Sequence, residues 1–426
     1  MCVFVNRRPP AIRRPASLLA VSVAALCLTL GSSAQALPMS LDAALVIADQ
    51  SAPAIEAKRA DGEAAAQSRI SAGRLPDPKV RLGLDNFPVS GPPAGRFGAD
   101  SMTAGAVSLI QDMPNGSKRQ AQRARADADI DAAAAATDVQ KRLVRLNTAL
   151  AWMDLYFAKQ RLAALSEIDR ALAPMRKSAP SQLAAGASRP AETLEAQRLT
   201  AQLGDRRAEL TALIGRAKAE LARWTGDSDA DVAGDPPDLS IDADALRAAI
   251  KDHPLLHSFD AMGRQADADR DLAVAGKTPD WSFDVGYQRR GEMWGDMVTA
   301  GVTISLPLFG STRQDPEIAA KTQVAHRVRF EKQDAERGLA AQLDSDLADH
   351  VMHHDQWMRS RDTLVPIAKK QADLETVSFA AGDAALSQTL TALLGLAEAK
   401  IEALNREAAV KRDAVRINLT YGSNAR

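Results

Sequence analysis

Residues 281–288 read Trp281-Ser282-Phe283-Asp284-Val285-Gly286-Tyr287-Gln288, in which apolar residues alternate with polar or small ones. After a polar turn over 289–295, the alternation resumes from Met297 to Leu306. Successive side chains of a strand point to opposite faces, so this pattern predicts two strands, at about 280–289 and 296–306, each with one apolar face. Segments of this length and pattern are typical of transmembrane β-barrels, where lipid contacts one face and water the other.

A second, less regular strand pair is predicted earlier in the chain, at about 78–87 and 102–111. Val80, Leu82 and Leu84 alternate with polar or small residues, whereas 106–109 slips out of that register. Aromatic residues gather in or beside the four segments, and Trp and Tyr favour membrane interfaces; they are Phe87, Phe97, Trp281, Phe283, Tyr287, Trp294 and Phe309. A soluble antiparallel sheet with an aromatic core is the alternative for these strands.

The sequence also repeats itself at a spacing near 200 residues. Ala72-Gly73-Arg74-Leu75-Pro76-Asp77 recurs as Ala275-Gly276-Lys277-Thr278-Pro279-Asp280, and three further matches follow in the same order, at 103–105 and 299–301, 116–120 and 310–314, and 184–186 and 380–382. Such self-similarity predicts a tandem duplication, with halves at 37–240 and 241–426. Each half is expected to hold a helix (about 40–73 and 241–275), the strand pair, and a long helical hairpin (about 117–226 and 314–420).

The hairpin helices are predicted to be unusually long. The only candidate breaks are Pro174 with Pro180 in the first half and Pro366 in the second. At 1.5 Å per residue, each arm would reach about 100 Å. Apolar residues follow coiled-coil spacing at Leu146, Leu150, Met153 and Phe157. Elsewhere the apolar stripe is mostly alanine, which buries little area per residue and favours a multi-helix wall or an oligomer over a monomeric coiled coil.

The N-terminus has the order of a secretory signal peptide. Four arginines precede an apolar run at 18–30, and Ser33-Ala34-Gln35-Ala36 follows as a small-residue cleavage signal, so we expect cleavage of residues 1–36. Removing these four of 53 basic residues leaves 49 against 54 acidic ones, a net charge of -5. Nothing in this balance indicates a nucleic-acid partner. Cys2 and Cys27 leave with the peptide, and Leu26 before Cys27 argues against a lipid anchor.

Three histidines, His350, His353 and His354, are the only grouping that suggests a metal. His350 and His354 would share one helix face at a spacing that can ligate a divalent cation. They also continue an apolar stripe through Leu343 and Leu347, as packed histidines would, and no third ligand is evident. We therefore predict no metal site and no cofactor, with His350 and His354 as the candidates to test. Without a phosphate loop, nucleophile elbow or HExxH motif, no enzyme is predicted.

This combination of signal peptide, duplication, strand pairs and long hairpins resembles the outer membrane factor (TolC-like) family over residues 40–420. The segment 304–309 followed by Arg313 is similar to the family's strand-to-helix junction, and 379–382 with Thr389 and Leu390 is similar to its hairpin-tip signature. The resemblance implies a mainly α-helical fold with a β-barrel contribution. It also implies a homotrimer with a twelve-stranded barrel among the lipids of the outer membrane and a helical tunnel in the periplasm.

The resemblance further implies the passive exit duct of a tripartite efflux system. Its helical tip would dock onto a periplasmic adaptor (membrane fusion) protein coupled to a proton-driven inner-membrane pump. The cargo would be metal cations or small toxic compounds, and the chain departs from the metal-exporting branch in lacking a lipid-anchor cysteine. Docking and gating are expected at Gly186, Ser188, Arg189, Gly382 and Asp383, with Arg189 and Asp383 as candidates for contacts that close the channel. The alternatives are a soluble periplasmic coiled-coil scaffold or adaptor, and a type I polypeptide secretion channel.

Overall fold

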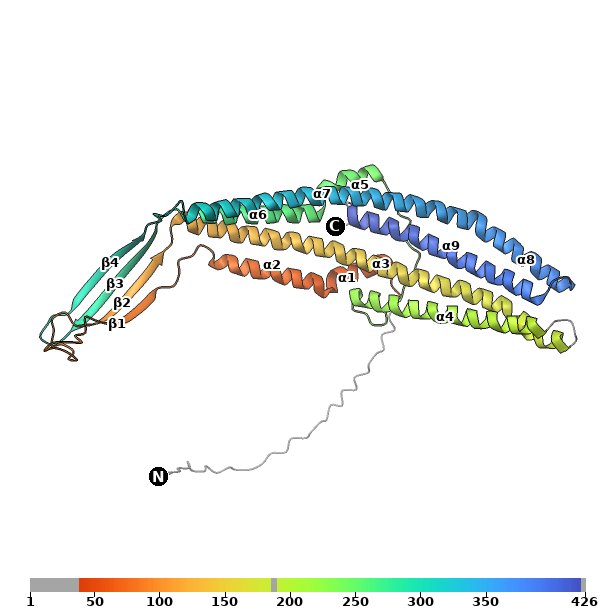
Figure 1. The fold of residues 1–426 in the computed structure, drawn as a ribbon, viewed down its shortest axis with the longest axis horizontal. Coiled ribbons are helices and arrows are strands. Elements are labelled where there is room, and N and C mark those ends of the chain that lie inside the picture. The colour runs from red at the N-terminus through yellow and green to blue at the C-terminus, as the bar shows by residue number, and fades with distance from the viewer. Residues whose placement is uncertain (1–37, 185–189, 423–426) are drawn as a thin grey trace, which may run out of the picture. The chain divides into compact units, whose positions relative to one another are not determined.

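The computed structural model describes residues 38–184 and 190–422 and shows a mainly helical fold with a small antiparallel sheet (Figure 1). The first half contains α1 (Leu41–Ser51), α2 (Pro53–Ser71), β1 (Lys79–Asp85), β2 (Ala104–Met113), α3 (Gly116–Ala184) and α4 (Pro190–Thr225). The second contains α5 (Ala243–Ala249), a 3-10 turn (Ile250–Asp252), α6 (Pro254–Ala275), β3 (Asp280–Arg290), β4 (Met297–Ser305), α7 (Gln314–Arg359), a π-helical turn (Ser360–Leu364), α8 (Val365–Ala381) and α9 (Leu386–Tyr421).

The helix expected at the start of each half is broken, and the prediction of one continuous helix there was wrong. Pro53 occupies the first position of α2, and Ala52 before it is extended at φ -67° and ψ 118°. In the second half, Pro254 begins α6, and His253 before it is extended. The cause is the proline ring, which disfavours helical geometry in the preceding residue. Each proline therefore separates a short first helix from the longer one that leads to the sheet.

The long helix α3 spans 69 residues and continues through Pro174 and Pro180, where a break had been a candidate. An interior proline costs a helix about 3 kcal/mol, which the packing of this part of α3 offsets. Leu165 and Leu172 are buried in a core cluster with residues of α4 and α9. In the second half, Pro366 is the second residue of α8, just after the π-helical turn. Such a turn is a local widening of the helix that accommodates an interrupted hydrogen-bond ladder.

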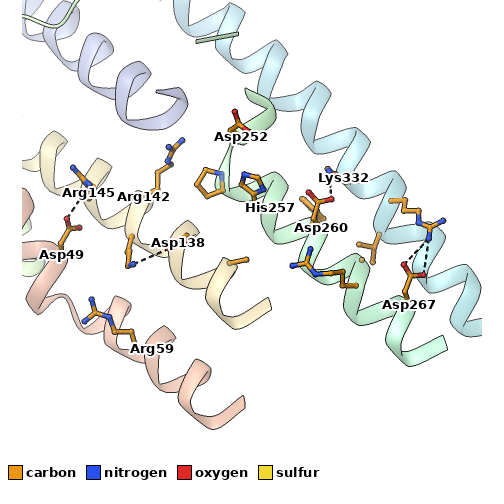
Figure 2. A pocket seen from close by; sticks show the side chains of 18 of the residues that line it. Asp49, Arg59, Asp138, Arg142, Arg145, Asp252, His257, Asp260, Asp267 and Lys332 are labelled. Carbon is orange, nitrogen blue, oxygen red and sulfur yellow. Dashed lines mark hydrogen bonds and ion pairs between the residues drawn. The ribbon is translucent and has the colours of Figure 1, made fainter. Parts of the chain in front are cut away.

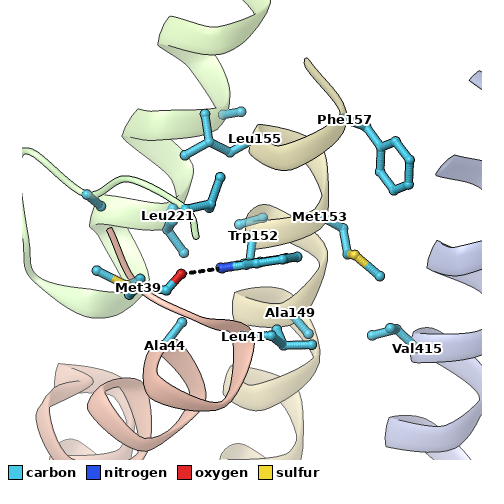
Figure 3. Packing of buried hydrophobic residues seen from close by; sticks show 14 of the residues in the cluster. Met39, Leu41, Ala44, Ala149, Trp152, Met153, Leu155, Phe157, Leu221 and Val415 are labelled. Carbon is cyan, nitrogen blue, oxygen red and sulfur yellow. Dashed lines mark hydrogen bonds between the residues drawn. The ribbon is translucent and has the colours of Figure 1, made fainter. Parts of the chain in front are cut away.

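The main core surrounds Trp152 on α3, where α1, α4 and α9 meet (Figure 3). Its indole is fully buried, and Nε1 donates to the Met39 carbonyl at 2.9 Å. Met153 and Leu155 beside it are also fully buried. Helix α3 contacts α2, α4, α6 and α9 and is thus the element around which the others pack.

The sheet has four antiparallel strands in the order β1-β2-β3-β4. Lys79 to Asp85 of β1 pair without interruption with Ile110 to Ala104 of β2. The predicted register slip at 106–109 was therefore wrong, since Val107 and Leu109 stay on one face. Ile110 and Gln111 are the residues that depart from the alternation. The strands end where the long helices begin, β2 before α3 and β4 before α7.

Candidate functional site

The strand pairing sorts the side chains of the sheet into one apolar face and one polar face. Directly opposite residues of antiparallel strands share a face, so the pairs Leu82–Val107, Leu109–Val285 and Phe283–Val302 connect all four strands on one side. We call this side the apolar face. It consists of Val80, Leu82, Leu84, Val107, Leu109, Trp281, Phe283, Val285, Tyr287, Val298, Val302 and Ile304. Leu82 and Val298 are each 74% exposed, so this face is uncovered within the chain.

The opposite face of the sheet carries charged, hydroxyl and small residues. It includes Lys79, Arg81, Ser108, Asp112, Ser282, Asp284, Gln288, Thr299 and Thr303. Lys79 pairs with Asp112 at 2.7 Å. Gly286 lies in a crowded position, since a Cβ there would lie 2.7 Å from both the Ser108 and the Thr299 hydroxyl oxygens, and these side chains would have to rotate to make room. The sheet thus presents a water-compatible surface on one side and a lipid-compatible one on the other.

A hydrogen-bonded clasp, centred on Asn115 and Asp280, joins the two halves of the chain at the junction of sheet and helices. The Asn115 backbone N–H and Nδ2 donate to Asp280 Oδ1 at 2.8 and 2.9 Å, and Nδ2 also donates to the Thr278 and Ala275 carbonyls. Lys118 Nζ lies 2.9 Å from the other Asp280 oxygen. The recurring motif at 275–280 therefore has a structural role. Sequence reasoning found the motif but not its partner Asn115.

The end of the second helical hairpin is formed as predicted around Gly382. Its φ of 86° is left-handed, and the Asp383 N–H donates to the Ser378 carbonyl at 2.9 Å, which closes the end of α8. Asp383 follows as an exposed residue before α9. Gly186, Ser188 and Arg189 lie outside the described residues. Docking and gating at all five positions remain predictions.

The histidine pair His350 and His354 lies on one face of α7, with ring centroids 6.4 Å apart. The pKa of His350 is lowered, chiefly by burial and against the attraction of Asp413, whereas His354 is exposed and meets the Trp357 ring edge-on. His353 points elsewhere, with Nδ1 2.7 Å from Asp413 Oδ2 on α9. Among the described residues, no group of three or more His, Cys, Asp or Glu could hold a metal ion.

A buried polar network between α7 and α9 was not predicted from the sequence. Asp346 accepts hydrogen bonds from Tyr421 Oη at 3.1 Å and Gln342 Nε2 at 3.0 Å, and Arg416 bridges Asp346 and Asp413 at 3.3 and 3.2 Å. Burial, with Asp346 nearby, raises the pKa of Tyr421. The contacts join residues up to 75 positions apart, and no local pattern marks them in the sequence.

A charged crevice of about 1180 Å³ is lined by residues of α1, α2, α3, α6 and α7 (Figure 2). Ion pairs cross its rim, including Arg329 with Asp267 at 3.3 Å and Lys332 with Asp260 at 2.5 Å. Burial raises the pKa of Asp49 against the opposing charges of Arg145 and Lys141. Acidic and basic side chains alternate around the crevice. We therefore interpret it as a polar surface and not as a binding site for an anion or a cation.

Among the described residues, no helix is both long and apolar enough to cross a membrane. No family model matches the sequence, and no curated protein matches it.

Several solved structures share the fold. The CmeC outer membrane channel of Campylobacter jejuni is 12% identical at a TM-score of 0.75, covering 97% of this chain and 94% of that one. A membrane protein from Pseudomonas aeruginosa is 17% identical at a TM-score of 0.77, covering 97% and 96%. CusC, described in terms of transmembrane channel formation, is 14% identical at a TM-score of 0.71, covering 97% and 99%. The chain therefore shares its fold with the CmeC outer membrane channel and with CusC, which confirms the resemblance to the TolC-like family at the level of the fold.

Proposed function

We propose that this protein is the outer-membrane channel of a tripartite efflux system, a passive duct without catalytic activity. The observation that carries the proposal is the sheet with one exposed apolar face, one polar face and two outer edges, β1 and β4, that pair with no strand among the described residues. An open sheet of this kind cannot lie in lipid, because its edge N–H and C=O groups would be unsatisfied. Closure with further copies satisfies them.

A trimer would close three such sheets into a twelve-stranded barrel, with the apolar face toward lipid and the polar face lining water. The aromatic residues fit this placement. Trp281 is the second residue of β3, near the helices, whereas Tyr287 lies toward its other end. The two residues are six positions apart, about 20 Å along the strand at 3.4 Å per residue. For a strand tilted by about 40°, this is about 15 Å along the barrel axis, which fits within the apolar band of outer-membrane barrels, about 25 Å tall.

The helices would form the periplasmic tunnel. At 1.5 Å per residue, the 69 residues of α3 extend about 100 Å, and the hairpin end at Gly382 would be the tip that meets an adaptor and its inner-membrane pump. Two exposed apolar side chains of α8, Leu374 and Val377, lie within about 12 Å of Gly382 along the helix and would offer a contact surface near the tip. We also propose that residues 1–36 are a cleaved signal peptide and that the halves 37–240 and 241–426 arose by duplication.

Membrane fractionation tests the proposal. The channel should sediment with outer membranes and, after extraction into detergent, have the mass of three chains by light scattering. Release by osmotic shock as a monomer would contradict the proposal and favour a soluble periplasmic scaffold.

The cargo is proposed to be a metal cation or a small toxic compound. Deleting the gene and measuring cellular metals beside a panel of organic toxicants would separate the two. Excess copper, zinc, cobalt or nickel that falls on complementation would indicate metal export. A His350→Ala, His354→Ala double variant that complements fully would then show that these histidines are not required for transport. Retention of neither metals nor toxicants would contradict efflux and leave polypeptide secretion as the alternative.

A further inference from the structure

The charges that β1 and β2 contribute to the polar face of the sheet, opposite the apolar face, cancel one another. Lys79 of β1 pairs with Asp112 of β2 at 2.7 Å. Arg81 lies 4.0 Å from Asp85 on the same strand. The remaining residues of the two strands on this face carry no charge. These two strands therefore add no net charge to the polar face.

The charged residues at the two ends of β3 also have partners. Asp280, at its start, belongs to the clasp and lies 2.9 Å from Lys118 Nζ. Arg290, at its end, donates from Nε to the Gly295 carbonyl at 2.6 Å, and its backbone N–H donates to Asp296 Oδ1 at 3.4 Å. Asp296 therefore brings an opposite charge next to that of Arg290. The residues of β4 on this face are hydroxyl residues, a glycine and a methionine, and none carries a charge.

Asp284, near the middle of β3, is the exception. It lies between Ile110 of β2 and Gly301 of β4, neither of which can neutralise a carboxylate. Its side chain lies over Gly301, since a Cβ there would be 2.5 Å from Asp284 Oδ1. Within residues 38–184 and 190–422, the Asp284 carboxylate forms no ion pair and no hydrogen bond. The polar face of one chain thus carries one uncompensated negative charge, at Asp284.

We infer that Asp284 makes the pore of this channel select cations over anions. The inference rests on the proposed function, which supplies three copies of the chain and a closed barrel with the polar face inward. The three Asp284 carboxylates would then lie at one level of the pore wall, as a ring of three negative charges. Rings of acidic side chains favour cations in water-filled pores. The cargo that this pore favours is therefore cationic.

The width of the pore decides whether such a ring can act on the whole cross-section. Twelve strands spaced by about 4.8 Å and tilted by about 40° give a wall with a radius of about 12 Å. The screening length in salt solution is about 10 Å at 0.1 M and about 3 Å at 1 M. In dilute salt, the field of the inward-facing carboxylates thus reaches the pore axis, whereas concentrated salt confines it to the wall. The cation preference should therefore fall as the salt concentration rises.

Reversal potentials across a planar lipid bilayer test this inference, with KCl at about 10 mM on one side and about 100 mM on the other. The native channel should be more permeable to K⁺ than to Cl⁻. Asp284→Asn, which removes the charge at nearly constant volume, should lower this permeability ratio at least about twofold. Asp284→Glu keeps the charge and should keep the ratio. The matched control is the double variant Lys79→Gln, Asp112→Asn, which removes two opposite charges from the same face and should leave the ratio unchanged.

Conductance in about 1 M KCl, where the charges are screened, should be equal in all these channels, which shows that their pores have the same width. If Asp284→Asn forms no channels, Thr303→Lys takes its place, because it leaves Asp284 intact and adds a compensating charge to the same face. A ratio that neither substitution lowers would overturn the inference, as would an equal fall in the double variant. Failure of the native protein to form channels would instead overturn the proposed function.

Discussion

His253 caps the amino end of α6 through its ring, since Nδ1 accepts a hydrogen bond from the Leu255 N–H at 3.1 Å. Burial and the nearby Arg142 guanidinium lower the pKa of His253 to about 4. The unfolded chain binds the proton more tightly, near the ordinary histidine pKa of about 6.5. The neutral ring thus contributes stability that is fully present above pH 6.5 and is lost as the pH falls toward 4, about 3 kcal/mol in all.

We predict that His253→Asn makes stability less dependent on pH in this window. Asparagine keeps a side-chain oxygen for the cap but has no proton to gain. Between pH 7.5 and pH 5, the thermal midpoint of the native protein should fall further than that of the variant, measured at equal protein concentration. Equal shifts in the two proteins would show that His253 is not the group responsible.

Trp152 offers a second residue-level prediction. Trp152→Phe removes the indole N–H that donates to the buried Met39 carbonyl and leaves part of the space of the indole ring empty. Because that carbonyl keeps the Ala233 N–H at 3.0 Å, we expect a loss of about 1–3 kcal/mol from one hydrogen bond and the small cavity together. The control is Tyr156→Phe, which removes an exposed hydrogen bond to Asp235 of 3.0 Å and should change the free energy of unfolding by less than about 0.5 kcal/mol. Denaturant unfolding of both variants checks the difference, and similar values would contradict the assigned role.

Among the helices and strands, the strands were predictable because the alternation of apolar and polar residues, as at Trp281, Phe283 and Val285, is a local sequence pattern. The early breaks at Pro53 and Pro254 were also readable from the prolines. The predicted helices at 40–73 and 241–275 nevertheless included both prolines. The continuity of α3 past Pro174 was not readable, since contacts from distant helices outweigh the local proline cost.

The clasp is a contact of elements distant in sequence, which no local pattern could reveal. Asn115→Ala removes the Nδ2 donor from Asp280 and from the Thr278 and Ala275 carbonyls. We expect backbone amides near both strand-to-helix junctions to exchange hydrogen about 10- to 100-fold faster, equivalent to about 1–3 kcal/mol of local stability.

Hydrogen exchange followed by mass spectrometry measures this change. Asn405→Ala is the control, because Asn405 Nδ2 donates an exposed hydrogen bond to Glu402 Oε2 at 3.2 Å, far from the clasp in the sequence. Unchanged exchange at 113–119 and 275–281 in Asn115→Ala would show that the clasp does not hold the junction.

At the scale of the whole molecule, the duplication and the two-faced sheet were evident in the sequence. How two copies of the chain could meet depends on which strands of the sheet have an unpaired edge. The strand order shows that these are β1 and β4, and the sequence alone does not. Phe309 is 69% exposed within one chain. If the proposed trimer buries this side chain between copies, Phe309→Ala should lower the trimer fraction on dilution in detergent about tenfold or more, as expected from losing a buried aromatic side chain. Met293→Ala, at an 81% exposed loop position, should leave the trimer fraction unchanged. Equal effects of the two substitutions would contradict burial of Phe309 between copies.

Conductance across a planar lipid bilayer tests the central proposal most directly, with Thr303→Cys and Val302→Cys channels exposed to a charged, water-soluble thiol reagent. Because these neighbouring residues lie on opposite faces of β4, we expect both variants to form stable channels. The reagent should reduce the conductance of the Thr303→Cys channel only. A protein that forms no channels, or channels blocked through Val302→Cys and not Thr303→Cys, would contradict a barrel whose polar face lines the pore.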